Sequence, residues 1–377
     1  MNKRASILLT ACLLLAGVGS GVPKVHADDW FEDKTGYYTL VDESGNELTM
    51  MAREMLVKDE YISGDNKHYS IISVDKDKKK AVAKYLGDVQ LPEIEEDTAS
   101  IDVLAQELDK SRNILLYSTH TDESYIPSDG SHSRPGEGGI LDVAETFKNA
   151  LQSRGINAVL DKTPHEPHDA GAYRRSRQTA INLIKKYSPV AAIFDIHRDA
   201  VPARVYVTRV AGQPMTKVRI VVGSRNQNRK ANEELAYKIK AVADKVYPGL
   251  IKDIYIGAGA YNQELSPRSL LFEFGTHENS KEAAQRAAEH LAVVIDKAMF
   301  GGKVQGKTQE GEEKGTYRPE PIDREDTRGG RSGMLWLLLA LVIGAGIFFF
   351  ISGGGREMMS KVTGTFDSKD KDGKRKR

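Results

Sequence analysis

Residues 112–300 alternate short apolar segments with longer segments in which apolar residues recur at helical spacing. The apolar segments that predict strands are 113–117, 158–160, 190–194, 205–207, 218–222 and 270–274. The segments that predict helices are 140–151, 180–187, 228–246 and 281–299. This order predicts an α/β fold, with a mostly parallel open sheet and helices on both of its faces. Ligands of such sheets bind beyond the carboxyl ends of the strands.

The composition narrows the chemistry available to this chain. Its 54 basic and 53 acidic residues leave a formal net charge of +1, without the basic excess that is typical of nucleic-acid binding. The single cysteine, Cys12, excludes an internal disulfide framework and a zinc site built on several thiolates. A metal site in this chain must therefore use His, Asp and Glu side chains.

The N-terminal segment has the pattern of a secretory signal peptide. Lys3 and Arg4 precede an uncharged run over residues 5–18, and small residues lead to Ala27. A basic start, a short apolar core and small residues before a cut predict a signal peptide over 1–27. An uncleaved anchor is one alternative, and lipidation at Cys12 is another, because residues 9–12 resemble a lipoprotein cleavage box.

The C-terminal segment carries a second apolar run. Residues 332–355 contain no charged side chain, and a basic tail follows at 356–377. A helix of this length crosses a hydrocarbon core of about 30 Å, and basic residues stay on the cytoplasmic side. The sequence thus predicts a single-pass protein of the cell membrane with an extracytoplasmic catalytic domain. A buried globular helix is the alternative.

Two further segments complete the expected organisation. Residues 28–111 read as a small β-rich N-terminal domain and a connector, with strand-forming residues at 37–41 and 69–74. Residues 301–331 are rich in Gly, Lys and Glu and have almost no apolar content. Such a composition cannot bury enough surface to fold, so we expect a flexible tether.

Polar clusters follow or interrupt three of the apolar segments of 112–300. His120 and Glu123 follow the first segment, His197 follows the segment 190–194, and Glu273 lies within 270–274. Two histidines and a carboxylate at strand ends are the ligands of a zinc site with an open position for water. Each histidine has an alternative role as a hydrogen-bonded residue at a strand end. An unpaired carboxylate inside an apolar run is costly, so Glu273 needs a cation, a metal or a catalytic purpose.

Other polar residues in this region have a possible structural role as well as a possible functional one. Glu123 could cap a turn, and Glu137 could cap the helix that begins near residue 139. His165 and His168 flank a proline in a loop and read as solvated residues. The basic group around Arg175 is either a solvated helix face or a contact for an anionic substrate.

Five motifs in this region resemble the stage II sporulation protein P family. They are HTDESY at 120–125, YRRSR at 173–177, DIHRDA at 195–200, YNQELS at 261–266 and LFEFG at 271–275. The resemblance covers residues 112–299, in the right order and spacing. It implies an amidase-like fold and a zinc-dependent N-acetylmuramoyl-L-alanine amidase, also credited with endopeptidase activity, that degrades peptidoglycan during engulfment in sporulation. It implies stage II sporulation proteins D and M as partners, beside peptidoglycan and the membrane.

The resemblance also assigns roles to individual residues. It implies His120 and His197 as zinc ligands and Glu273 as the catalytic acid/base. Glu123, inside the family motif, is the expected third ligand, and Glu137 is its rival. The expected substrate-binding residues are Arg198, Arg175 and Asn262.

The sequence departs from the family pattern at two points. Ser118 stands where the family often has another histidine, and the expected anchor lies at the C-terminus rather than the N-terminus. The second departure bears on partners and on the role in engulfment, whereas the chemistry is unaffected. Two other functions stay open, a stem-peptide endopeptidase without amidase activity and a non-catalytic tether that binds the cell wall.

Overall fold

The computed structural model describes residues 36–95, 112–169, 171–301 and 303–305. The strands of the main sheet are β1 (Tyr38–Asp42), β2 (Glu47–Met51), β3 (Glu60–Ile62), β4 (Lys67–Asp75), β5 (Lys80–Asp88), β7 (Asn113–Tyr117), β8 (Ala158–Leu160), β9 (Val190–Asp199), β12 (Val218–Gly223), β13 (Ile251–Gly257) and β14 (Ser269–Thr276). Two small ribbons pair β10 (Val207–Val210) with β11 (Gln213–Thr216), and β6 (Glu93–Glu95) with β15 (Lys303–Gln305).

The helices are α3 (Ile126–Asp129), α4 (Ile140–Gln152), α5 (Ala172–Lys186), α6 (Arg229–Val246) and α7 (Lys281–Asp296), with short turns η1 (Ala203–Val205), η2 (Gln263–Leu265) and η3 (Lys297–Gly301). Their amphipathic spacing explains their packing. In α4, Ile140, Val143, Ala144, Phe147 and Leu151 are buried, which is one stripe at 3.6-residue spacing. The N-terminus of α7 is capped by Ser280, whose hydroxyl accepts a hydrogen bond from the Ala283 N–H.

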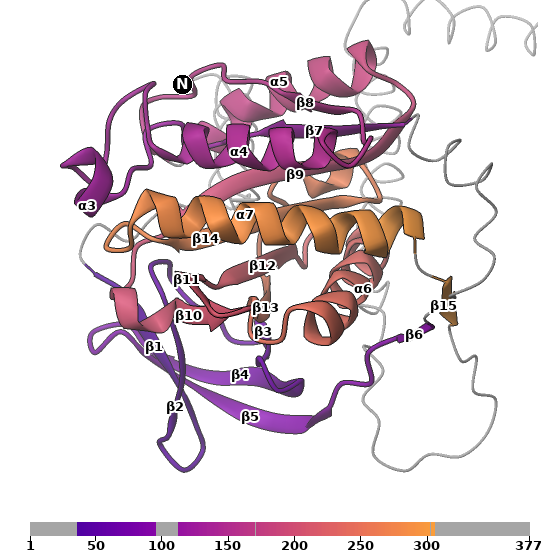
Figure 1. Ribbon diagram of the computed structural model, residues 1–377. Coiled ribbons are helices and arrows are strands. Elements are labelled where there is room, and N and C mark those ends of the chain that lie inside the picture. Colours follow the sequence, from indigo (N-terminus) through magenta and orange to yellow (C-terminus); the bar gives the residue numbers. More distant parts are fainter. Residues whose placement is uncertain (1–35, 96–111, 170, 302, 306–377) are drawn as a thin grey trace, which may run out of the picture. The chain divides into compact units, whose positions relative to one another are not determined.

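The main sheet has eleven strands in the order β2-β1-β5-β4-β3-β13-β12-β14-β9-β7-β8. Helices cover both of its faces, as expected. Alternate residues of β7 show this, because Ile114 and Leu116 join the core that includes α4, α6 and α7, whereas Leu115 and Tyr117 pack with Ala180 of α5. Figure 1 shows α4 and α7 side by side on one face of the sheet. The N-terminal strands lie at the edge of the sheet opposite β8.

The expectation of a mostly parallel sheet is wrong, because the sheet is mixed. Strand β12 is parallel to β13 but antiparallel to β14, and β3, β4 and β5 pair antiparallel. The reason lies in the chain between β9 and β12, which holds only the turn η1 and the β10–β11 hairpin. Parallel neighbours need a crossover connection, and without a helix here the chain re-enters the sheet in the opposite direction.

Some expected segments lie outside the described residues. These are the signal peptide at 1–27, the transmembrane helix at 332–355, the basic tail at 356–377 and most of the tether at 301–331. Among the helices that the structure describes, none combines the length and the apolar character needed to span a bilayer.

Strands β1 to β5 belong to the main sheet, and a buried charge network connects them to its central strands. Arg219 of β12 is fully buried, and its guanidinium donates to Asp253 of β13 at 2.6 Å and to Asp199 of β9 at 2.9 Å. The same guanidinium donates to the hydroxyl of Thr49 in β2 at 2.7 Å, and Asp199 accepts the Ala52 N–H at 3.2 Å. The network therefore connects the N-terminal strands to the carboxyl end of β9.

Removing this guanidinium should destabilise the fold strongly. Arg219→Met keeps most of the side-chain volume but leaves Asp253 and Asp199 buried without their main counter-charge, and breaking such a pair costs about 3–5 kcal/mol. The matched control is Arg204→Met, which removes an exposed ion pair with Glu47 whose side chains are 62% and 41% exposed. Urea unfolding of both variants gives the free energies, and similar losses in the two would contradict this account.

Candidate metal centre

The site forms where β7 and β9 end side by side. The turn at 118–125 follows β7 and brings the His120 Nδ1 atom to 3.2 Å from the Glu123 Oε1 atom. His197, near the end of β9, brings its Nδ1 atom to 3.1 Å from the same oxygen. The other oxygen of Glu123 accepts the backbone N–H of Arg198 at 2.8 Å. Two imidazoles thus converge on one buried carboxylate.

Glu273 adds a second carboxylate beside this cluster. Strand β14 runs parallel to β9 and pairs Glu273 with His197 in register. The Glu273 Oε2 atom is buried without a hydrogen-bond partner, and burial together with the nearby Asp199 carboxylate raises the pKa of Glu273 well above its ordinary value. The register shifts just after Glu273, where Gly275 has a φ of +73° and a Cβ would lie 2.5 Å from Thr216. Only glycine suits that position.

The two imidazoles carry different electrostatic states. The Nε2 atom of His197 lies 2.9 Å from the Asp195 carboxylate, which itself accepts the Thr119 N–H at 2.8 Å. Burial alone would lower the pKa of His197, but the carboxylates of Asp195 and Glu123 outweigh it and hold that pKa well above its ordinary value. Burial lowers the pKa of His120 to about 4, so its ring is neutral near pH 7, as a metal ligand requires.

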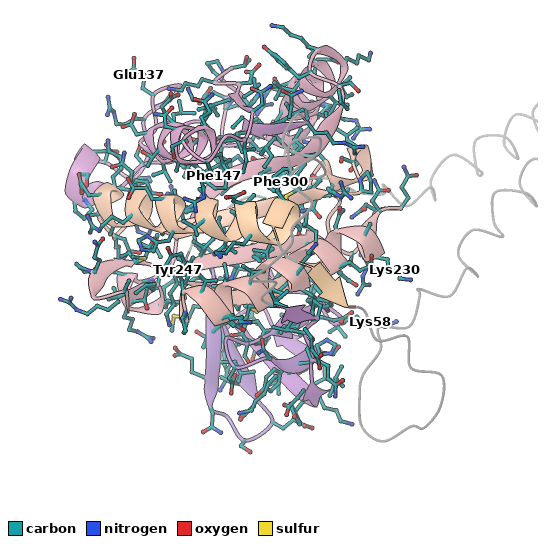
Figure 2. The ribbon with its side chains drawn as sticks, turned by 45° about the vertical axis from the view of Figure 1, so that its right-hand side comes forward. Lys58, Glu137, Phe147, Lys230, Tyr247 and Phe300 are labelled. Carbon is teal, nitrogen blue, oxygen red and sulfur yellow. The ribbon has the colours of Figure 1, made fainter. Side chains whose placement is uncertain are left out.

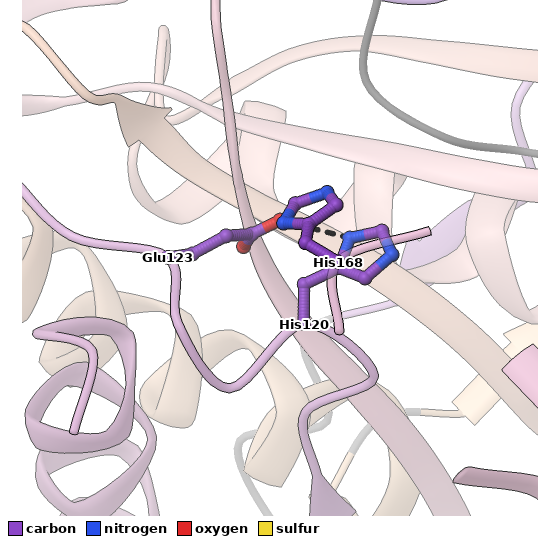
Figure 3. Close-up of side chains that lie close together, drawn as sticks. All are labelled: His120, Glu123 and His168. Carbon is purple, nitrogen blue, oxygen red and sulfur yellow. Dashed lines mark hydrogen bonds and ion pairs between the residues drawn. The ribbon is translucent and has the colours of Figure 1, made fainter. Parts of the chain in front are cut away.

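A third imidazole lies over the cluster. The ring of His168 stacks on that of His120 with centroids 3.8 Å apart, and its Nδ1 atom lies 2.9 Å from the Asp122 carboxylate. His120, Glu123 and His168 each bring one ligand atom within 4.8 Å of the others (Figure 3). The sequence places His168 in a loop with no sign of this role, because its partner Asp122 is 46 residues away.

The two glutamates proposed as third ligand differ in position. Glu123 lies inside the cluster, with 3% of its surface exposed. Glu137 has 78% of its side chain exposed, pairs with Arg134 at 3.4 Å and points outward from the surface (Figure 2). Only Glu123 is placed to share a metal with the histidines in this structure.

The two arginines expected to bind substrate donate hydrogen bonds to backbone carbonyl oxygens of the loops around the site. The Arg198 guanidinium donates to the carbonyl oxygens of Ser124 at 3.3 Å and His132 at 2.9 Å. The Arg175 Nε atom donates to the carbonyl oxygen of His165 at 2.7 Å. In this arrangement both side chains fix the backbone that carries the histidines.

Asn262, also expected to bind substrate, is 3% exposed and holds neighbouring structure. Its amide donates to the Tyr173 carbonyl oxygen at 3.1 Å and the Ser176 hydroxyl at 3.0 Å. Asn262 and the preceding Tyr261 have φ angles of +57° and +51°, two left-handed residues in succession. This segment positions the start of α5 against the site.

Two tyrosines, Tyr173 beside the histidines and Tyr261 next to it, were not identified from the sequence; we call this pair the Tyr173 wall. The Tyr173 ring lies 5.7 Å from that of His120 and 6.4 Å from that of His197, centroid to centroid. Tyr261 packs behind Tyr173 at 5.7 Å, and its hydroxyl accepts a hydrogen bond from Arg53, which lies just after β2. Tyr173 belongs to the YRRSR motif, where the arginines drew attention to charge instead of the aromatic ring.

The residues present fit a divalent metal such as zinc. Two imidazoles and the Glu123 carboxylate are zinc's usual ligand types, and the Nε2 atom of His120 is buried with no hydrogen-bond partner. The Asp195–His197 contact is the carboxylate–histidine pair that orients metal ligands.

Comparisons with known proteins point to one family. The sequence model described as stage II sporulation protein P matches residues 33–296. The stage II sporulation protein P of Bacillus subtilis (strain 168) is 28% identical over 232 residues, which are 57% of this chain and 58% of that protein. The match thus spans less than two thirds of the relative's length.

Solved structures of amidases show a partial likeness. An N-acetylmuramyl-L-alanine amidase from Mycobacterium smegmatis aligns with 50% of this chain and 96% of its own, at 16% identity and a TM-score of 0.33. The CwlD amidase from Clostridioides difficile, solved with the GerS lipoprotein, aligns with 50% and 95%, at 14% identity and a TM-score of 0.34. The family match covers most of the chain and confirms the resemblance seen in the motifs, so this chain belongs to the stage II sporulation protein P family.

Proposed function

We propose that this chain is a zinc-dependent peptidoglycan hydrolase. The bond it would cleave is the amide between the lactyl group of N-acetylmuramic acid and the L-alanine of the stem peptide. The observation that carries the proposal is the convergence of His120, Glu123 and His197 beside Glu273, a buried carboxylate with a raised pKa. Membership of the sporulation family supports peptidoglycan as the substrate.

His120, Glu123 and His197 would hold the metal. When bound, zinc supplies a Lewis acid that polarises the scissile carbonyl and lowers the pKa of the attacking water. Glu273 accepts the proton of that water and then gives it to the leaving nitrogen of L-alanine. A raised pKa suits this double role, because the carboxyl must hold the proton between the two transfers.

The surrounding residues keep these groups in place. Asp195 holds the far nitrogen of His197, and the Arg198 N–H holds the far oxygen of Glu123. The Tyr173 ring, which is itself buried, packs beside the two histidines. In a site with little water, electrostatic interactions are stronger, which supports proton transfer by Glu273.

We further propose that the hydrolase acts outside the cell membrane during sporulation. Family membership supports the sporulation role, and the sequence patterns of 1–27 and 332–355 support export and anchoring. The partnership with stage II sporulation proteins D and M stays a prediction.

The metal-binding part of this proposal predicts a contrast between two glutamates. Glu123→Gln removes a charged ligand and should weaken zinc binding by at least about 100-fold, beyond the effect of losing an outer partner. Glu137→Gln should bind about one zinc per chain with unchanged affinity, because that side chain is exposed. Competition with a chromophoric chelator measures both affinities. Loss of zinc in the Glu137 variant, with retention in the Glu123 variant, would contradict the assignment.

The catalytic part predicts that Glu273→Gln retains zinc but hydrolyses cell wall about 10²–10⁴-fold more slowly, the usual loss for a general base. Glu289→Gln, an exposed carboxylate on α7, is the matched control and should hydrolyse at the normal rate. Mass spectrometry of the released fragments should find stem peptides that begin with L-alanine. Fragments cut only within the stem would instead identify an endopeptidase, and full activity of metal-free protein would overturn the zinc mechanism.

A further inference from the structure

The segment 161–169, between β8 and α5, carries His168, whose ring contacts the proposed metal ligand His120. His168 stacks on His120, and one of its ring nitrogens is within 4.8 Å of ligand atoms of His120 and Glu123. Its side chain is 12% exposed, so the ring shields the cluster from solvent. His197, whose Nδ1 atom contacts the same Glu123 oxygen at 3.1 Å, makes a fourth side chain of a ligand type beside this group, whereas three are enough for a catalytic zinc site.

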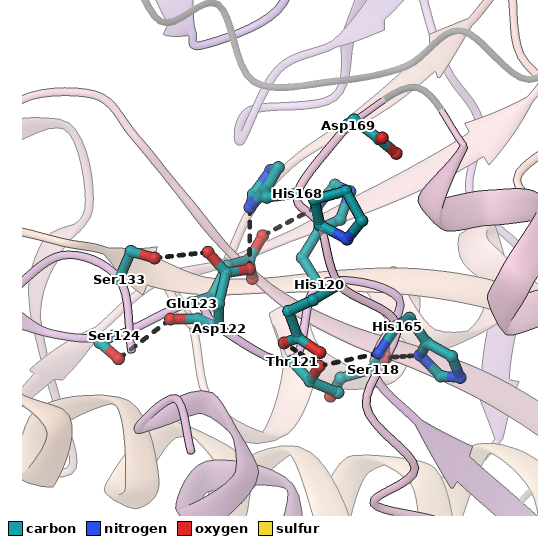
Figure 4. Close-up of polar contacts among 12 residues, drawn as sticks. Ser118, His120, Thr121, Asp122, Glu123, Ser124, Ser133, His165, His168 and Asp169 are labelled. Atoms are coloured by element: carbon teal, nitrogen blue, oxygen red, sulfur yellow. Dashed lines mark hydrogen bonds and ion pairs between the residues drawn. The ribbon is translucent and has the colours of Figure 1, made fainter. Parts of the chain in front are cut away.

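His168 is held in this place by a carboxylate of its own. Asp122, which is 5% exposed, contacts the His168 Nδ1 atom at 2.9 Å and accepts a hydrogen bond from the Ser133 hydroxyl at 2.6 Å (Figure 4). This repeats the Asp195–His197 arrangement, in which a carboxylate orients an imidazole toward the cluster. The Asp122 carboxylate therefore fixes the His168 ring in its position over the cluster.

Hydrogen bonds hold the segment 161–169 next to the proposed metal site. The Thr121 hydroxyl donates to the Glu166 carboxylate at 2.6 Å, which also accepts the Gly136 N–H at 2.8 Å. Arg175 holds the other side through the carbonyl oxygens of His165 and Pro167. His168 therefore approaches the cluster from a defined loop, and its removal leaves these contacts in place.

We propose that His168 is a fourth protein ligand of the metal, which closes the site in the resting enzyme. A catalytic zinc needs one position for water or substrate, and a site with four protein ligands is closed. His168 must therefore leave the metal before hydrolysis. This inference rests on the proposed zinc site and concerns its resting state.

The test compares metal binding in the full chain and three variants. His168→Ala should weaken zinc binding at least about tenfold in chelator competition, the lower end of the range for loss of an outer partner. Asp122→Asn, which disturbs only the orientation of the ring, should weaken it less. His132→Ala removes an exposed histidine of the same region and should bind zinc like the unmodified chain.

Cobalt(II) gives a second readout that does not depend on activity. The visible absorption of bound cobalt(II) reports the number and geometry of its ligands, so His168→Ala and His168→Gln should both change the spectrum, whereas His132→Ala should not. The inference is overturned if both His168 variants keep the normal affinity and spectrum while His120→Ala loses the metal, a result that leaves the proposed function intact. If His120→Ala also binds metal normally, the zinc site itself is refuted and the inference falls with it.

Discussion

Strand β9 has a parallel partner on each side, and the site depends on this pairing. Its pairing with β7 sets His197 beside the turn that carries His120 and Glu123, and its pairing with β14 sets His197 opposite Glu273. Three segments far apart in the sequence thus deliver the four side chains of the proposed site to one end of the sheet. The hydrogen-bond ladder fixes His197 and Glu273 relative to each other more rigidly than loops would.

The N-terminal strands take part in the same construction. Tyr255 of β13 packs among the apolar side chains of β1, β4 and β5, and Ile62 of β3 belongs to the core under α6 and α7. Arg219 then links Thr49 of β2 to Asp199, two residues beyond His197. A β-rich segment that contributes no side chain to the proposed metal site therefore supports β9, the strand that carries the proposed ligand His197.

Part of this architecture was predictable from sequence and part was not. Apolar runs that are followed or interrupted by His or Glu marked β7, β9 and β14, because buried strands and the sites beside them leave local patterns. The direction of β12 depends on the absence of a crossover helix between β9 and β12. A list of predicted strands does not by itself show this, because it says nothing about strand direction. The Asp122–His168 contact joins residues 46 positions apart and leaves no local trace. Arg198, Arg175 and Asn262 were recognised as special, but their backbone and side-chain partners appear only in three dimensions.

The left-handed pair Tyr261–Asn262 has a consequence for how the catalytic half tolerates change. Tyrosine avoids this conformation at a cost of about 1–2 kcal/mol, whereas asparagine adopts it more readily, so Tyr261 holds most of the backbone strain next to the site. Arg53, just after β2, donates a hydrogen bond to the Tyr261 hydroxyl. The side-chain amide of Asn262 holds the second residue against α5 through the Tyr173 carbonyl oxygen. The strain is maintained by contacts from both halves of the sheet. A catalytic segment expressed without residues 36–95 would lose one of the two restraints, and the Tyr173 wall would lose its fixed backing.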